Sequence, residues 1–457
     1  MKLATTAMLA TPSAGADRSR SLLVVTSTAL AGALLIAAAR IARWGIDRSS
    51  DVPDVATGDR FGGLAPYLTD SGLRPGVVLG AVLLTVPVLA LAVQALRVGS
   101  LARERRMSSL RLAGATPGDA RRVAAAEAGG GAFVGGLLAG PAYVVLWVLL
   151  GVLPSSGLRM MPTPSGLDLL AWLVVAVVAA LAGGIAGAVV QGRVITDPLG
   201  VRRRGSVSRA GRGNLVTLVS GLLLIGLGVY AFRNPSNAGF AAIVVLIAGL
   251  LLLAFSVAPR LVRLRGQRLA RRGPARDLLA GARLAADPVA AGRVAAVLMI
   301  CGLALGIEAS MVAGLLGENR SADDLSFYLT GFAMAALGVL VAVVVTILTL
   351  LVGAADQLLD ARRPLASLGA LGVDATTLER VLRRQQSATA VPAAVLGALI
   401  GGAFGLFLEG NMGVALTAAL LAAAALGLAV ALITRLAARL LRTKLLEALD
   451  PENLRVA

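Results

Sequence analysis

The stretch Leu101–Glu127, with the sequence LARERRMSSLRLAGATPGDARRVAAAE, organises this chain because a second copy of it occurs later. The second copy is Leu359–Gln385, LDARRPLASLGALGVDATTLERVLRRQ. At a constant offset the two copies place identical or equivalent residues opposite each other: Ser109 with Ser367, Leu110 with Leu368, Gly114 with Gly372, Thr116 with Asp374, Arg122 with Arg380 and Val123 with Val381. The repeat predicts a chain built from two similar halves.

Each copy contains the residues that typically mark the end of a helix, a sharp turn and the start of a second helix. Gly114 can take the left-handed conformation that ends a helix. Thr116 is then a good N-cap, Pro117 suits the first helical position, and Asp119 can accept hydrogen bonds from the free N–H groups of the first turn. In the second copy Asp374 takes the cap position after the glycine.

Arginines keep the first copy out of a membrane interior. Seven of them lie between Arg97 and Arg122. At roughly 2.5 to 3.5 kcal/mol for each arginine at a membrane centre, burying them there would cost about 20 kcal/mol. We therefore expect each helix–turn–helix segment to lie in water at the membrane surface and to lead into an apolar span.

The composition places the chain among membrane proteins. Of its 457 residues 57% are hydrophobic and only 15% are charged, and the mean hydropathy is +0.83. Soluble domains are far more polar than this. The sequence predicts an all-α integral membrane protein.

The residue inventory excludes several function classes. The net charge of +18 could suggest nucleic-acid binding, but aromatic residues are scarce at 4% and the arginines fall between apolar runs. We therefore expect no nucleic-acid partner. Histidine is absent and the single cysteine, Cys301, lies inside an apolar run. We expect no metal site, no catalytic residues and no cofactor bound by this chain.

The apolar runs predict ten membrane-spanning helices, each long enough for a hydrocarbon core of about 30 Å. In chain order they are Ser21–Ala42, Gly76–Val98, Ala128–Leu153, Leu167–Gln191, Asn214–Phe232, Phe240–Ala258, Val294–Leu316, Tyr328–Gly353, Ala390–Leu408 and Met412–Thr434. Small residues four apart, such as Gly131 and Gly135 or Gly397 and Gly401, are typical of closely packed membrane helices.

The repeat groups these spans as four plus two plus four. Both halves begin on the same side, so we expect two same-orientation repeats related by an axis along the membrane normal. The expected external loops, Arg43–Pro75 and Gly317–Phe327, are too short for a large extracytoplasmic domain. The segments are a tail (1–20), a first four-span domain (21–205), a two-span insert (206–258), a basic linker (259–293) containing a helix-like patch at 278–286, and a second four-span domain (294–457).

Charge predicts the orientation. Most of the 43 lysines and arginines fall in the tails and loops on the side of the two termini. By the positive-inside rule that side is cytoplasmic, which predicts a multi-pass protein of the plasma (inner) membrane with both termini in the cytoplasm. Anionic lipid headgroups are then expected neighbours of the basic loops.

The repeated residues carry a resemblance to a known family. The pattern S-L-x-x-x-G-[AV], followed by a capped arginine-rich helix and a glycine-rich span, resembles the FtsX-like (MacB-type) permease domain of ABC transporters. Two such domains in tandem would cover nearly the whole chain except the fifth and sixth spans. Permeases of this type usually also carry a large extracytoplasmic domain, and in that respect the chain differs.

The resemblance implies a permease subunit that is not itself an enzyme. No G-x-x-x-x-G-K-[ST] phosphate loop occurs in the sequence, so ATP would be hydrolysed by a separate cytoplasmic ABC ATPase, expected as a dimer. The two turns would be the coupling elements that dock on it. The coupling residues are Leu112, Ala113, Gly114, Ala115 and Thr116 in the first copy and Ala370, Leu371, Gly372, Val373 and Asp374 in the second.

Other functions are compatible with parts of the pattern. The expected activity is export, or force transmission on a membrane-derived or amphipathic substrate. The alternatives are a non-transporting scaffold or sensor relay driven by ATP, and a secondary transporter. A secondary transporter needs polar residues within its spans, and Glu308 is the weak candidate for a substrate or proton site. Glu127 is expected at a solvated helix end.

Overall fold

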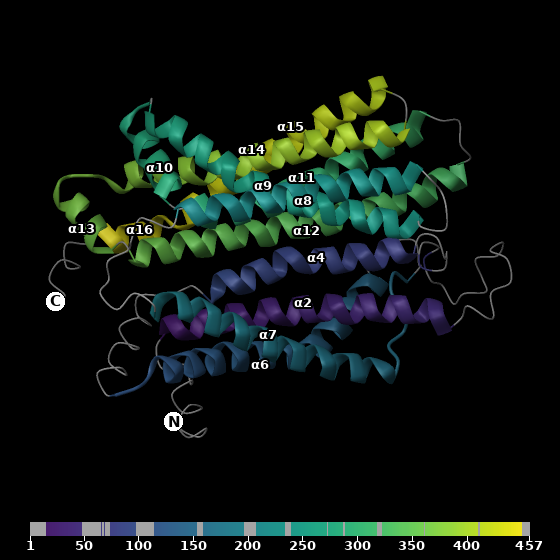
Figure 1. Ribbon diagram of the computed structural model, residues 1–457, viewed down its shortest axis with the longest axis horizontal. Coiled ribbons are helices and arrows are strands. Elements are labelled where there is room, and N and C mark those ends of the chain that lie inside the picture. Colours follow the sequence, from purple (N-terminus) through teal and green to yellow (C-terminus); the bar gives the residue numbers. More distant parts are fainter. Residues whose placement is uncertain are drawn as a thin grey trace. The chain divides into compact units, whose positions relative to one another are not determined.

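A computed structural model describes residues 15–47, 65, 68, 74–96, 114–152, 159–195, 207–233, 239–271, 273–286, 288–317, 322–360, 362–409 and 412–449. Within these ranges the regular elements are all α-helices, and no strand occurs among them (Figure 1). The chain divides into two compact units, residues 1–201 and 202–457. The all-α class expected from composition is confirmed for the residues described.

The first unit is a bundle of four described helices. The first helix, α2, packs against each of the other three, and α6 packs against α7. Arg20 at the start of α2 contacts Glu127 early in α6, so these two helices run parallel from the same end of the unit. The helices are α2 (Gly15–Asp47), α4 (Arg74–Ala95), α6 (Pro117–Val152) and α7 (Leu167–Ile195).

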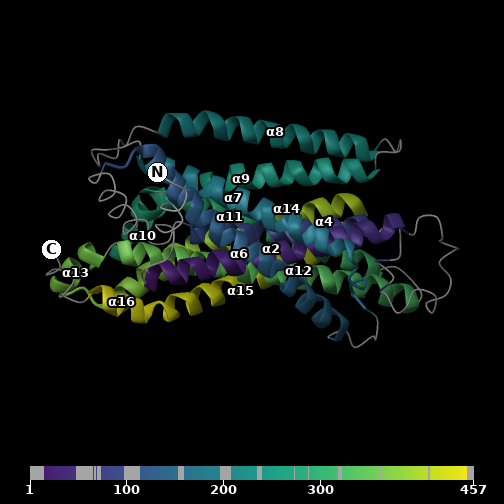
Figure 2. The same cartoon turned by 90° about the horizontal axis from the view of Figure 1, so that it is seen from below.

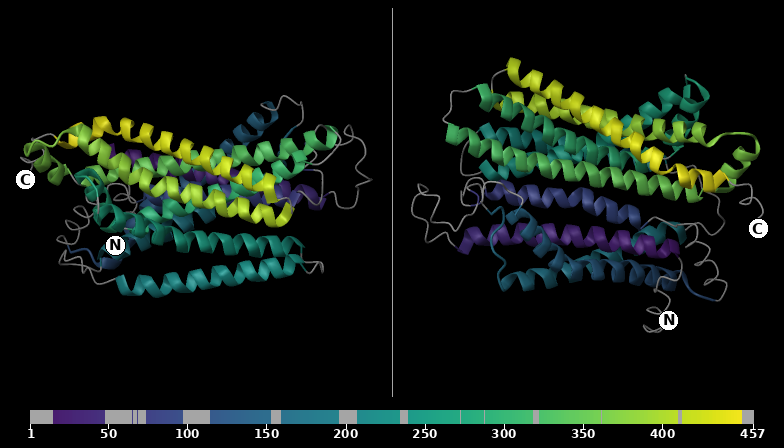
Figure 3. Two further views of the ribbon diagram at one scale, coloured as in Figure 1. Left: turned by 90° about the horizontal axis from the view of Figure 1, so that it is seen from above. Right: turned by 180° about the vertical axis from the view of Figure 1, so that it is seen from behind.

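The second unit contains nine described helices. Its centre is α11, which packs against α9, α12, α14 and α15, while α14 and α15 lie side by side (Figure 3). The helix α8 lies along α9 (Figure 2), and the short α10 packs on α9 and α14. The helices are α8 (Val207–Arg233), α9 (Gly239–Arg271), α10 (Ala275–Ala286), α11 (Pro288–Gly317), α12 (Ala322–Asp360), α13 (Arg362–Ala370), α14 (Ala375–Glu409), α15 (Met412–Leu440) and α16 (Arg442–Leu449).

Nine of the described helices are long and apolar enough to cross a membrane. They overlap nine of the expected spans, although several of the helices extend ten residues or more beyond the expected bounds, and the chain is therefore an all-α membrane protein. At the fifth expected span, α8 carries a shorter apolar stretch, Leu215–Ala231. Most of the first expected external loop, Arg43–Pro75, lies outside the described residues.

Glycines let pairs of helices approach until their backbones touch. A Cβ atom added at Gly135 in α6 would lie 2.7 Å from the Cβ of Thr28 in α2. In the second unit, one added at Gly397 would lie 2.8 Å from the carbonyl carbon of Met299 in α11. Contacts this short leave no room for any side chain, as expected for small residues at membrane-helix crossings.

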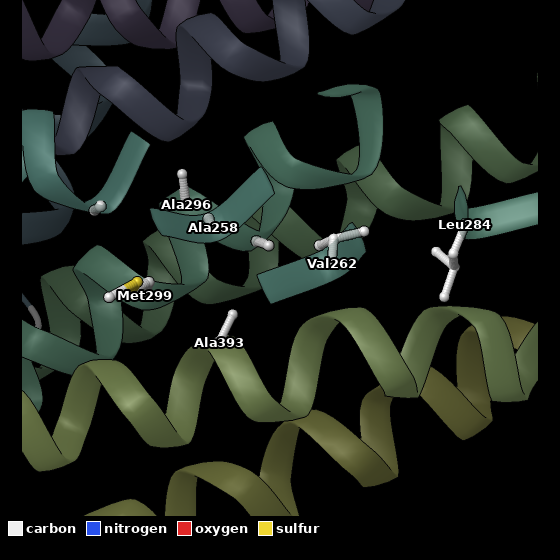
Figure 4. Close-up of a cluster of buried hydrophobic side chains, with 8 residues drawn as sticks. Ala258, Val262, Leu284, Ala296, Met299 and Ala393 are labelled. Atoms are coloured by element: carbon white, nitrogen blue, oxygen red, sulfur yellow. The ribbon is translucent and has the colours of Figure 1, made fainter. Parts of the chain in front are cut away.

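The predicted linker 259–293 is largely helical. The helix α9 continues through Pro259 to Arg271, and α10 covers the helix-like patch expected at 278–286. A cluster of buried side chains joins α9, α10, α11 and α14 at one end of the second unit (Figure 4). Its members are Ala254, Ala258, Val262, Leu284, Ala295, Ala296, Met299 and Ala393.

Candidate functional site

The first turn has the predicted glycine and cap. Gly114 has a φ of +94°, and a Cβ added there would meet nothing within 4 Å. The backbone N–H of Thr116 donates to Asp119 Oδ2 over 3.1 Å, and the backbone N–H of Asp119 donates to Thr116 Oγ1 over 3.2 Å. This reciprocal capping box starts α6 at Pro117, so the predicted helix start is confirmed.

The first turn is also open to solvent. Gly114 and Thr116 are exposed, and Ala115 between them is half-buried. The two remaining residues of the predicted coupling set, Leu112 and Ala113, lie outside the described part of the chain. An exposed turn at the head of a long helix can contact a partner without rearranging the bundle behind it.

The second turn is a complete helix C-cap motif. Gly372 has a φ of +87°, its N–H donates to the carbonyl of Gly369 over 2.9 Å, and the N–H of Val373 donates to the carbonyl of Leu368 over 3.0 Å. These two bonds are the 5→2 and 6→1 pair of the Schellman motif that ends a helix. The side chains of Val373 and Leu368 both pack against one buried cluster, the apolar contact that accompanies the motif.

Asp374 caps the next helix, as predicted. It directly precedes α14, and its carbonyl accepts hydrogen bonds from the N–H groups of Thr377 and Leu378. Its carboxylate accepts a bond from the Thr376 hydroxyl over 2.5 Å. Ahead of it, Leu371 is 80% exposed at the tip of the turn. An apolar side chain held this far into solvent favours a contact with another surface.

A small core holds the second turn rigid. Its buried residues come from the end of α12, from α13, from the start of α14, and from the end of α15 with α16: Ala354, Leu358, Leu365, Leu378, Leu382, Leu441, Leu445 and Ala448. A Cβ added at Gly369 in α13 would lie 2.9 Å from the carbonyl oxygen of Leu449 in α16. The helix α16 was not anticipated, because the sequence around it reads only as a basic tail.

The helix α10 braces α14 a few turns behind the second turn. Arg384 of α14 donates to the Asp277 carboxylate of α10, with an Nε–Oδ1 distance of 3.1 Å. Asp277 is buried, and Gly281 fits α10 against α9 so closely that an added Cβ would lie 2.5 Å from the backbone nitrogen of Ala270. The start of α14 is therefore fixed from two sides.

A buried ion pair fixes the corresponding end of the first unit. Arg20 donates to the Glu127 carboxylate, and their side chains are only 6% and 8% exposed. The expectation that Glu127 is a solvated helix end is therefore wrong. Its position near the cytoplasmic end expected for this helix suggested a solvated carboxylate, whereas the parallel packing of α2 on α6 brings Arg20 onto it.

Removing one partner of this pair is expected to be costly. Glu127→Ala would leave the Arg20 guanidinium buried without its counter-charge, and such changes lower the free energy of unfolding by about 3–5 kcal/mol. The expected result is a clear fall in the melting temperature of the purified chain in detergent. The double change Arg20→Gln with Glu127→Gln removes both charges and should recover part of the loss. A melting temperature unaltered by Glu127→Ala would contradict the pairing.

The opposite end of the first unit has a second buried cluster that the sequence did not reveal. Asp168, at the start of α7, pairs with Arg43 and accepts a hydrogen bond from the Ser165 N–H over 2.8 Å. Arg40 donates from Nε to the carbonyl of Thr163 over 2.9 Å. These contacts fasten the 159–166 segment to α2. The signal available was a pair of arginines at the end of an apolar span, too common to assign.

Glu308, the weak candidate for a substrate site, lies within α11. It is half-buried in α11, and its carboxyl reaches the backbone of Ala336 in α12. Among the described residues no group of three or more His, Cys, Asp or Glu side chains could hold a metal ion. The two exposed, capped turns are therefore the candidate site.

Comparison of the chain with protein-family models, with curated proteins and with solved structures found no match.

Proposed function

We propose that the protein is the permease subunit of an ABC transporter, with two FtsX-like domains in tandem. The observation that carries the proposal is the equivalence of the two turns. In each, a glycine with positive φ is followed by a capping residue and then by a long helix, α6 or α14. Two exposed turns that share a glycine and a capping residue suit a dimeric partner that presents a similar surface to each turn.

The helix neighbours support a repeat of four helices. In the first unit α2 packs on α4, α6 and α7, and α6 packs on α7. In the second unit α11 packs on α12, α14 and α15, and α14 packs on α15. The same pairings in the same chain order favour two same-orientation four-span repeats, with α8 and α9 as the insert and α8 as the tenth span of a four plus two plus four arrangement.

The long helices suit a mechanical role. The 36 residues of α6 and the 35 residues of α14 are continuous helices. At 1.5 Å per residue each is about 50 Å long, enough to run from the turn through a bilayer. ATP-driven closure of the partner would move the two turns, and each helix would carry that motion to the far side of the membrane. ATP is bound by the partner and not by this chain.

Orientation and substrate follow as parts of the same proposal. The arginine-rich ends, which include both turns, face the cytoplasm, and the protein resides in the plasma (inner) membrane with both termini inside. The outer faces of α7 and α8 are apolar and exposed, with Leu173 57% and Leu223 68% exposed, as suits contact with lipid. A substrate that reaches the complex from the membrane, such as a lipid or an amphipathic peptide, fits this surface best.

Affinity purification tests the proposal. The chain extracted in mild detergent should co-elute with a separate subunit that contains a phosphate-binding loop and hydrolyses ATP. An unrelated multi-pass protein purified in parallel should not. Amphipathic compounds should stimulate hydrolysis more than small hydrophilic solutes do. Absence of any ATP-hydrolysing chain, even after cross-linking in the membrane, would contradict the function.

A further inference from the structure

Arginines line α9 beyond its apolar part. The helix leaves its apolar stretch at Ala258 and continues unbroken to Arg271. Its arginines recur about once per turn, and α10 adds two more, whereas the only acid among residues 239–271 and 273–286 is Asp277, which already pairs with Arg384. The arginines are Arg260, Arg263, Arg265, Arg268 and Arg271 in α9 and Arg276 and Arg283 in α10.

The packing of α10 sets the height of each arginine above the apolar stretch. Gly266 lies against Leu284, and Gly281 lies against Ala270, so α10 runs antiparallel to α9 and returns toward the membrane. Arg283 therefore lies near the level of Gly266, with Arg263 and Arg265 on the facing helix. At 1.5 Å per residue these lie about 8 to 12 Å beyond Ala258, within reach of the headgroup layer for a long side chain.

Among the described residues, no acidic side chain pairs with the arginines at this level. Burial lowers the pKa of Arg283 by desolvation, although part of the side chain is open to solvent, and no acidic side chain among the described residues pairs with it. Along α9, arginines three apart repel each other, as do Arg260 and Arg263. A partly desolvated guanidinium beside other arginines favours an anion from outside the chain.

The apolar neighbour indicates which anion. Leu264, between Arg263 and Arg265, is 53% exposed. An exposed leucine flanked by arginines at the edge of a bilayer matches the boundary between acyl chains and phosphates. We propose that Arg263, Arg265 and Arg283, which lie at one level but project in different directions, bind the phosphate groups of anionic phospholipids in the adjoining leaflet. The site belongs to this chain alone and does not depend on the proposed transport function.

The test is lipid binding by the full chain purified in neutral detergent. Phosphatidylglycerol and phosphatidylcholine are titrated separately, and bound lipids are counted by native mass spectrometry. The site variant carries Arg263→Gln, Arg265→Gln and Arg283→Gln. The matched control carries Arg268→Gln, Arg271→Gln and Arg276→Gln, which removes the same charge from the end of the hairpin that is farther from the membrane. A further arm adds inorganic phosphate.

The site variant should bind phosphatidylglycerol about a hundredfold more weakly, since each arginine near an anionic surface contributes about a fivefold factor. The control should bind within about threefold of the unaltered chain, and phosphate should compete only weakly. Equal loss in both variants would mean unspecific charge attraction and would overturn the proposal. Unchanged lipid binding in the site variant would also overturn the proposal, even if that variant lost a bound protein.

Discussion

If the protein is the proposed ABC permease, a chain carrying Gly114→Val and Gly372→Val should lose the ATPase while it still reaches the membrane. Both glycines have φ near +90°, a region that a β-branched residue can scarcely adopt. Nothing lies within 4 Å of a Cβ added at either position, so the effect comes from backbone strain and not from a clash. Strain of about 1–3 kcal/mol at each turn would weaken docking by roughly ten- to a hundredfold for each turn.

Asparagine provides the matched control. Gly114→Asn with Gly372→Asn adds a side chain of similar size, but asparagine enters the left-handed region readily. This variant should keep most of the ATPase. The measurement is the amount of ATPase that co-elutes per permease, with membrane insertion followed by fractionation. A valine variant that retains the ATPase, or one that loses it only together with the protein itself, would disprove the docking role.

The sequence predicted the helix end and the capping residue at both turns because their determinants are local. Gly114, Thr116 and Asp119 lie within six consecutive residues, and the capping bonds between Thr116 and Asp119 involve no distant residue. The same holds for Gly372 and Asp374. The helical class and the approximate places of the long apolar helices were equally predictable, since long apolar runs in a bilayer must satisfy their backbone groups within the helix.

The supports of the turns were not predictable in the same way. Asp277 meets Arg384 across more than a hundred residues, and Glu127 meets Arg20 across a similar separation. Neither pair follows a local pattern, because each depends on which helix faces are brought together. The role of α16 beneath the second turn likewise depends on tertiary packing, since its leucines could as well have covered a membrane surface.

The glycines of the apolar helices were partly predictable. Their spacing predicted close packing, but not the residues that they meet. In α11 and α14 four glycines interlock: Cβ atoms added at Gly302 and Gly306 would each lie 2.9 Å from a backbone atom of Ala398, and one at Gly401 would lie 2.8 Å from the carbonyl carbon of Leu303. The crossing is therefore a backbone contact that runs along both helices, with Gly397 as its fourth member.

Gly397→Leu with Gly401→Leu should therefore prevent the second unit from folding. Each leucine would force α11 and α14 apart over the length of their contact. Overpacking costs about 1–3 kcal/mol for each site even where side chains can adjust, and here the obstructing atoms are backbone. Two sites would remove much of a stability of about 5–15 kcal/mol. Gly397→Ala with Gly401→Ala should give an intermediate loss.

The control makes the same glycine-to-leucine substitutions at two positions where the added side chains have room. Gly226 in α8 and Gly413 in α15 are exposed, and nothing lies within 4 Å of a Cβ added at either one. Gly226→Leu with Gly413→Leu should leave a monodisperse protein with an unchanged melting temperature, whereas the α14 pair should aggregate on extraction and become sensitive to protease. If the two leucine pairs melted at the same temperature, α11 and α14 could not be in backbone contact and would have to pack in some other way.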